Sequence, residues 1–192
     1  MKILIAGDSF AAEWPGATNG WVNLLANKYS VTNVAQAGCG EYRILKQLRN
    51  ENLYDYDLVI VSHTSPSRVY TPEHPLHKEG FHKNCDLIAN DIDRFALFND
   101  SLKAAQGWFK YHYNDEYQLD MYELVRDEIN RIIKIPYISI SHIEYIASIA
   151  KEKNHLNFSE LWGQERGDVN HYTPLGNITI FDEIEKCLKK MS

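Results

Sequence analysis

Several features are scarce or missing in this sequence of 192 residues. No run of 18 apolar residues occurs, so no membrane-spanning helix is predicted, and the four apolar residues at 3–6 are too few for a signal-peptide core. The three cysteines, Cys39, Cys85 and Cys187, are widely spaced and predict neither a disulfide framework nor a Cys-x-x-Cys metal site. The formal charge of -6 argues against nucleic-acid and anionic-membrane partners, because the chain has no excess of positive charge to neutralise phosphates. We therefore expect a cytoplasmic protein.

The composition is that of an ordinary globular domain. Hydrophobic residues make up 44% of the chain and charged residues 24%, which at this length is enough apolar material for a full core. We therefore expect residues 1–192 to form a single domain. The sequence leaves open whether that domain is a monomer or a homo-oligomer.

The first sixty residues alternate between short apolar runs and segments with helical spacing. Such alternation is typical of a doubly wound α/β fold with a parallel sheet, whose functional sites lie at the carboxyl ends of the strands. The predicted elements are strands at 2–6, 30–35 and 57–62 and helices at 21–29 and 43–53.

Residues 69–117 interrupt this alternation with weaker periodicity. They include an aromatic stretch at 108–113 (WFKYHY), which fits either stacking on a sugar ring or packing onto the sheet. We expect this segment to be an inserted, lid-like region.

Regular patterns resume after the insertion. Thr173 is the expected N-cap of a last amphipathic helix, with Pro174 in its first position. The predicted elements are helices at 121–133, 143–153 and 174–190 and a strand at 135–141.

A serine follows the first predicted strand in the tripeptide Gly7-Asp8-Ser9. A hydroxyl placed between a strand and a helix is exposed at the sheet edge, near backbone N–H groups that are free to hold an anion. This arrangement suits acyl transfer. The alternative is an ordinary turn, because all three residues favour turns.

Asp168 and His171 stand three residues apart just before the last predicted helix. On a loop, both side chains can face one site, where an imidazole takes the proton of a serine and a carboxylate orients the imidazole. Capping of the following helix is the alternative explanation.

Taken together, the Gly-Asp-Ser after the first strand and the Asp-x-x-His before the last helix resemble the SGNH (GDSL-type) hydrolase family, along nearly the whole chain. The resemblance implies a flavodoxin-like three-layer α/β/α sandwich with a parallel sheet and a serine esterase that needs no cofactor. It also implies Ser9 as nucleophile, His171 as base and Asp168 as the partner of His171.

The resemblance extends to a glycine that holds the oxyanion through its backbone N–H. Gly38 stands at that place, and the Ser9 N–H is the expected second donor. The third donor is the point of departure: relatives end the third strand with Gly-x-Asn-Asp, whereas residues 61–68 read VSHTSPSR without asparagine. Ser65, Thr64 and His63 are the candidates to replace it, although a histidine bonded for structural reasons is an equal alternative for His63.

Several other side chains lie near the motif loops. Trp14, Tyr42 and Tyr172 are the candidates for lining a substrate pocket. Arg68 fits either binding of a substrate carboxylate or phosphate or an ordinary surface ion pair.

Three histidines within the insertion, His74, His77 and His82, raise the question of a metal site. Their spacings of three and five residues match no single helix face, and no acidic ligand joins them in register. We therefore predict no metal site here.

The function expected from these residues is hydrolysis of a small acyl ester through an acyl-enzyme. An O-acetyl group on a carbohydrate or another small molecule is the expected substrate by analogy with the family. The alternatives are an acyltransferase that uses the same site and a binding protein that keeps the fold after losing catalysis.

Overall fold

The computed structural model describes residues 1–95, 97 and 99–191. Its strands form a five-stranded, wholly parallel sheet in the order β2-β1-β3-β4-β5. This is the flavodoxin-like order, and it confirms the predicted α/β class. The strands of the sheet are β1 (Lys2–Gly7), β2 (Ser30–Asn33), β3 (Leu58–His63), β4 (Tyr137–Ser141) and β5 (His155–Asn157).

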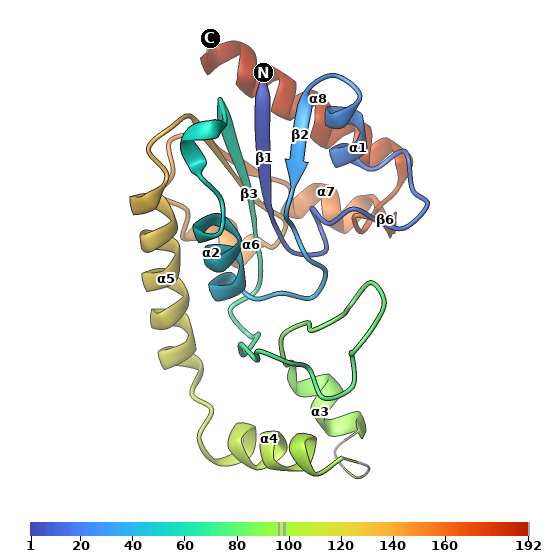
Figure 1. Ribbon diagram of the computed structural model, residues 1–192, viewed down its shortest axis with the longest axis vertical. Coiled ribbons are helices and arrows are strands. Elements are labelled where there is room, and N and C mark those ends of the chain that lie inside the picture. The colour runs from blue at the N-terminus through green and yellow to red at the C-terminus, as the bar shows by residue number, and fades with distance from the viewer. Residues whose placement is uncertain (96, 98, 192) are drawn as a thin grey trace.

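Both faces of the sheet are buried, because successive side chains of a strand point to opposite faces. In β1, Ile3 and Ile5 pack with residues of helices α1 (Trp21–Ala26) and α8 (Pro174–Met191). Leu4 and Ala6 pack instead with helices α2 (Glu41–Arg49) and α5 (Asp115–Ile132). Figure 1 shows the resulting three layers, with α2 and α5 on one side of the strands and α1 and α8 on the other.

Most predicted elements are present, with shifted ends. α5 begins at Asp115 rather than 121, because the side chain of Asn114 accepts a hydrogen bond from the N–H of Tyr117 at 2.8 Å and so caps the helix. The N-cap prediction for α8 is confirmed, since Thr173 Oγ1 accepts from the N–H of Gly176 at 3.1 Å.

The helix predicted at 143–153 is wrong in its second half. Helix α6 (Glu144–Ser148) is short, and the chain then continues into β5. The reason is a buried ion pair: Glu152 is held by Arg126 of α5, with Nε to Oε1 at 2.6 Å and Nη2 to Oε2 at 2.8 Å. This tertiary contact prevails over the local helical pattern.

The predicted insertion lies beyond the carboxyl ends of the strands (Figure 1). It begins as a loop after β3 and continues into helices α3 (Ala89–Phe95) and α4 (Asp100–Tyr111) before α5 begins. Ile92 and Leu102 form a small core of their own between these two helices. The remaining short elements are the 3-10 helix η1 (Leu53–Asp55), helix α7 (Ser159–Gln164) and strand β6 (Arg166–Val169).

Candidate active site

Ser9 lies in a tight turn at the carboxyl end of β1. The carbonyl of Asp8 accepts from the N–H groups of Ala11 and Ala12 at 3.0 and 2.9 Å, while Asp8 Oδ1 accepts from the N–H of Phe10 at 3.0 Å. Glycine at position 7 permits the close approach of β1 to β3 just before this turn, because a Cβ there would lie 2.8 Å from the Cβ of Ser62. Ser9 is therefore held on a rigid part of the fold.

His171 reaches Ser9 from the other end of the chain. Its Nε2 lies 2.7 Å from Ser9 Oγ, so a neutral His171 can accept the hydroxyl proton. The backbone of His171 is in the left-handed region with φ of 64°, and Asn170 before it has φ of 52°. Two such residues in succession are unfavourable and are kept in place by surrounding contacts, here by the bond from Asn170 Nδ2 to the carbonyl of Ala12 at 2.8 Å.

The surroundings of His171 favour its neutral form. Burial lowers the pKa of His171 below its usual value, and the nearby positive charges of Arg68 and His82 lower it further. Phe10 and Trp14 pack against the ring, with centroids 4.5 and 5.5 Å away. The imidazole is thus available as a base at neutral pH.

Asp168 does not approach the ring of His171 as the sequence predicted. Its side chain is exposed, and its carboxylate makes no hydrogen bond to His171 within the part of the chain that the structure describes. The carbonyl of Asp168 accepts the N–H of His171 at 3.4 Å, so the two residues share a hairpin turn. The geometry is therefore that of a Ser9–His171 dyad.

Gly38 lines the same cavity as Ser9 and lies in a loop after β2. Its φ of 73° requires glycine, and a Cβ at Gly38 would lie 2.6 Å from the Cβ of Cys85. The backbone N–H groups of Ser9 and Gly38 donate to no other described residue. Both residues line one cavity, so their N–H groups are the candidate donors to an anion there.

Two of the predicted replacements for the asparagine are placed differently. His63 is buried, and both ring nitrogens are engaged elsewhere: Nδ1 lies 2.5 Å from Glu41 Oε1 and Nε2 lies 2.9 Å from the hydroxyl of Tyr137. It is a structural histidine, and its suggested oxyanion role is not met. Ser65 does line the cavity, with its hydroxyl 2.8 Å from that of Ser67.

Arg68 brings a positive charge close to His171 and Asp8. It lines the same cavity as Ser9, and its Nη1 donates to the carbonyl of Gly38 at 3.2 Å. Its charge acts on two groups of the site, since it lowers the pKa of His171 and partly offsets the rise at Asp8. Burial raises the pKa of Asp8 to about 6.

The three aromatic residues predicted to line a substrate pocket lie in three different places. Trp14 lies beside the dyad, where its Nε1 donates to the carbonyl of Ser9 at 3.0 Å. Tyr42 contacts Tyr70 and lines a neighbouring, smaller pocket of about 250 Å³. Tyr172 is almost fully buried and serves the framework described next.

A buried framework supports the dyad, and the sequence analysis missed its centre, His142. This ring stacks on Phe10 at 4.3 Å, its Nδ1 lies 2.7 Å from the hydroxyl of Tyr172, and its Nε2 lies 3.1 Å from Ser62 Oγ. Burial lowers the pKa of His142 to about 3, so the ring is neutral. Its place directly after the predicted strand at 135–141 is the signal that points to it.

A cavity of about 1180 Å³ opens over the dyad. The insertion forms much of its wall, so α3 and α4 belong to the site. The contributing residues there include Ile88, Ala89, Ile92, Gln106, Phe109 and Tyr113. The aromatic stretch at 108–113 therefore packs partly within the insertion and partly against the cavity.

The insertion also gathers potential metal ligands. His74, His77 and Cys85 come together here. The possible ligand atoms of these three side chains lie within 4.8 Å of one another. The histidines considered from the sequence were His74, His77 and His82, without this cysteine, because an irregular turn separates Cys85 from His77.

Comparison with known proteins adds little to this geometry. No protein-family model and no curated protein matches the chain. A crystal structure of a protein from Lactobacillus plantarum, a structural genomics target, is similar at 13% identity with a TM-score of 0.44, over 98% of this chain and 96% of that one. None of the helices in the described ranges combines the length and apolar character needed to cross a bilayer.

Proposed function

We propose that this protein is a serine esterase of the SGNH type, which hydrolyses a small acyl ester through an acyl-enzyme. The observation that supports it most is the 2.7 Å contact between Ser9 Oγ and His171 Nε2, at the floor of a cavity that Ser9 and Gly38 also line. These two residues are 162 positions apart in the sequence, and their side chains lie within the distance that proton transfer needs.

The chemistry follows in two halves. Ser9 Oγ attacks the ester carbonyl while His171 Nε2 takes its proton, and the oxyanion forms against the N–H groups of Ser9 and Gly38. Collapse of this intermediate breaks the ester C–O bond, and the leaving alcohol takes the proton from His171. A water molecule then attacks the acyl-Ser9 carbonyl, again with His171 as base, and releases the acid.

Arg68 takes over the charge stabilisation that an asparagine supplies in related hydrolases. Its guanidinium is already bonded to the carbonyl of Gly38 and lines the cavity, so it stands beside the proposed oxyanion site. A cation is also needed here, because the carboxyl of Asp8 next to Ser9 is ionised above about pH 6 and opposes a second negative charge.

The size of the cavity favours an ester with a large alcohol part. A volume of about 1180 Å³ exceeds what an acetyl group alone requires, since pockets for drug-sized ligands measure roughly 300–1,000 Å³. An acylated carbohydrate fits this arrangement, with the acyl group at Ser9 and the sugar toward α3 and α4.

Hydrolysis of p-nitrophenyl acetate, together with labelling by a fluorophosphonate probe, tests the proposal. We expect the wild type to be active and labelled at Ser9, and Ser9→Ala to lose about 10⁴-fold or more in kcat and all labelling. Ser67→Ala is the matched control, because Ser67 is an exposed serine on the same cavity. Equal rates in Ser9→Ala and wild type would contradict the assignment.

Two rivals give different results in the same assays. An acyltransferase forms the same acyl-enzyme but passes the acyl group to a sugar hydroxyl, so product analysis with a sugar acceptor separates it from a hydrolase. A binding protein on the same fold leaves Ser9 unlabelled in the folded protein.

A further inference from the structure

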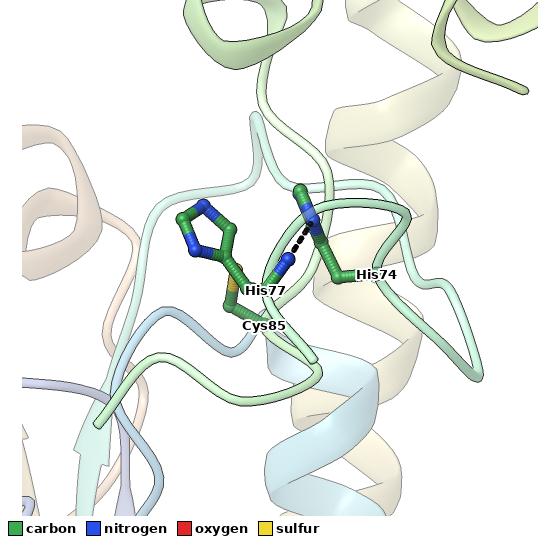
Figure 2. Close-up of side chains that lie close together, drawn as sticks. All are labelled: His74, His77 and Cys85. Atoms are coloured by element: carbon green, nitrogen blue, oxygen red, sulfur yellow. Dashed lines mark hydrogen bonds between the residues drawn. The ribbon is translucent and has the colours of Figure 1, made fainter. Parts of the chain in front are cut away.

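The loop between β3 and α3 brings three metal-binding side chains together. The ligand atoms of His74, His77 and Cys85 all lie within 4.8 Å of one another. Figure 2 shows these side chains with the bond from the N–H of His77 to His74 Nδ1. His74 and Cys85 are buried, with 0% and 4% of their surface exposed, and His77 is half-buried.

Backbone contacts hold this cluster in place. The N–H of Asn84 donates to the carbonyl of His77 at 2.7 Å, and the N–H of Cys85 donates to the carbonyl of His82 at 3.0 Å. Asn84 has φ of 54°, in the left-handed region, which reverses the chain just before the cysteine. The proximity of the ligands is thus a consequence of how the turn is built.

We propose that His74, His77 and Cys85 bind a zinc ion. Two imidazoles and a thiolate form the donor set that zinc prefers, and a tetrahedral zinc with bonds of about 2.0–2.3 Å places its ligand atoms about 3.5 Å apart. The three side chains therefore need to close in by roughly 1 Å, which side-chain rotation supplies. Binding releases the thiol proton of Cys85 to solvent.

His74 binds through Nε2. Its Nδ1 accepts the N–H groups of Leu76 and His77 at 3.1 and 3.2 Å. Coordination moves the ring proton from Nε2 to Nδ1, so the metal bond must outweigh the loss of these two hydrogen bonds. His82 is the candidate for the fourth ligand, because its Nδ1 and Cys85 Sγ flank the same glycine, Gly38.

The zinc site joins the insertion to the proposed oxyanion loop. Cys85 packs directly on Gly38, and the N–H of Asp86 donates to the carbonyl of Gly38 at 2.9 Å. His77, His82 and Cys85 also line the cavity above Ser9. With His82 as the fourth protein ligand the site is closed and the ion is structural, so it holds the cavity wall against Gly38.

Metal binding is tested on the full chain after removal of metal by a chelator. We expect one Zn²⁺ or Co²⁺ per chain, and the Co²⁺ form to show the near-ultraviolet charge-transfer band of a thiolate ligand. Cys85→Ser should lose that band and bind metal at least a hundredfold more weakly, because even loss of an outer partner costs 10- to 100-fold. Cys187→Ser is the matched control, since that thiol lies on α8 and should leave both properties unchanged.

Thermal unfolding keeps the test valid if a variant is destabilised. Zinc should raise the Tm of the wild type and of Cys187→Ser by mass action, but leave Cys85→Ser and His77→Ala unchanged. The proposal is overturned by absence of stoichiometric binding, by a Co²⁺ spectrum without the thiolate band, or by equal affinity in Cys85→Ser. None of these readouts depends on esterase activity.

Discussion

The two sides of the cavity are built in different ways. On the sheet side, Ser9 follows the buried strand β1, and the ring of His171 packs against Phe10. Phe10 in turn stacks on His142, whose ring nitrogens lie within hydrogen-bond distance of Ser62 and Tyr172. On the insertion side, the wall is a loop followed by α3 and α4, with a core of only a few buried residues. The proposed reacting groups are therefore positioned by the core of the fold, whereas the wall depends on hydrogen bonds and ion pairs.

One of these cross-links is visible at Asp86. This fully buried carboxylate accepts the N–H of Gly40 at 2.6 Å, binds Arg43 of α2 at 2.8 Å and accepts the N–H of Thr71 at 3.2 Å. It ties the insertion to the same loop that carries Gly38. A wall of this kind can be loosened without disturbing the sheet.

The largest expected effect is the loss of kcat in His171→Ala, compared with Asp168→Ala on the same side of the cavity. His171→Ala should lower kcat by about 10⁴-fold or more, because the base is lost. Asp168→Ala should cost less than about tenfold, because its carboxylate makes no bond to the ring, whereas an orienting carboxylate in a triad contributes about 10⁴-fold. Steady-state kinetics on p-nitrophenyl acetate gives both numbers. If Asp168→Ala lost as much kcat as His171→Ala, Asp168 would be a member of a catalytic triad.

The next effect tests the insertion side through stability. Asp86→Ala should lower the free energy of unfolding by about 3–5 kcal/mol, because it leaves Arg43 without its buried partner. Urea denaturation measures this change. Glu128→Ala removes an ion pair with Arg49 at the surface of the molecule and should have a much smaller effect. Similar midpoints for the two variants would show that the Asp86 contacts do not hold the wall.

Arg68→Gln probes the point where the two sides meet. We expect kcat/KM to fall by about 10²–10³-fold, as for loss of an oxyanion donor. The acid limb of the pH profile should also move to higher pH, because Arg68 lowers the pKa of His171 and the base must be neutral to act. Arg49→Gln serves as the control for charge alone. An unchanged limb in Arg68→Gln would place the guanidinium too far from His171 to act on it.

The smallest expected effect concerns the His142 framework. Its pKa is about 3 when folded against about 6.5 when unfolded, so the unfolded chain takes up the proton first as the pH falls. This one group should therefore remove about 2 kcal/mol of stability between pH 7 and pH 5. Denaturation at both pH values should show a smaller drop for His142→Gln than for wild type. Equal drops would mean that His142 is accessible to protons in the folded state.

The fold was largely predictable because the spacing of apolar residues along the chain shows which segments are buried. Residues 3–6 and 58–61 are continuous apolar runs, and both lie in strands that are buried on two faces. Thr173 before Pro174 located the start of α8 for a purely local reason, since a cap satisfies its own first turn. The failure at 143–153 has a distant cause, because Glu152 is captured by Arg126 on another helix.

The candidate site was predictable where a residue follows a strand or precedes a helix, as Ser9 and His171 do. Partners that depend on side-chain direction were not. His63 and His142 both follow strands, yet one points to Glu41 and the other to the ring of Phe10. No spacing in the chain encodes that choice.

The sequence by itself determined most of the individual strands and helices, the turn that bears Ser9 and the helix that follows His171. These features depend on local periodicity and capping. Tertiary structure alone decided that Asp168 stays exposed, that Arg68 reaches the carbonyl of Gly38 and that Cys85 joins His74 and His77. These outcomes depend on contacts between segments that are far apart or separated by irregular turns. Such contacts are settled by packing, which the order of residues specifies only through the whole fold.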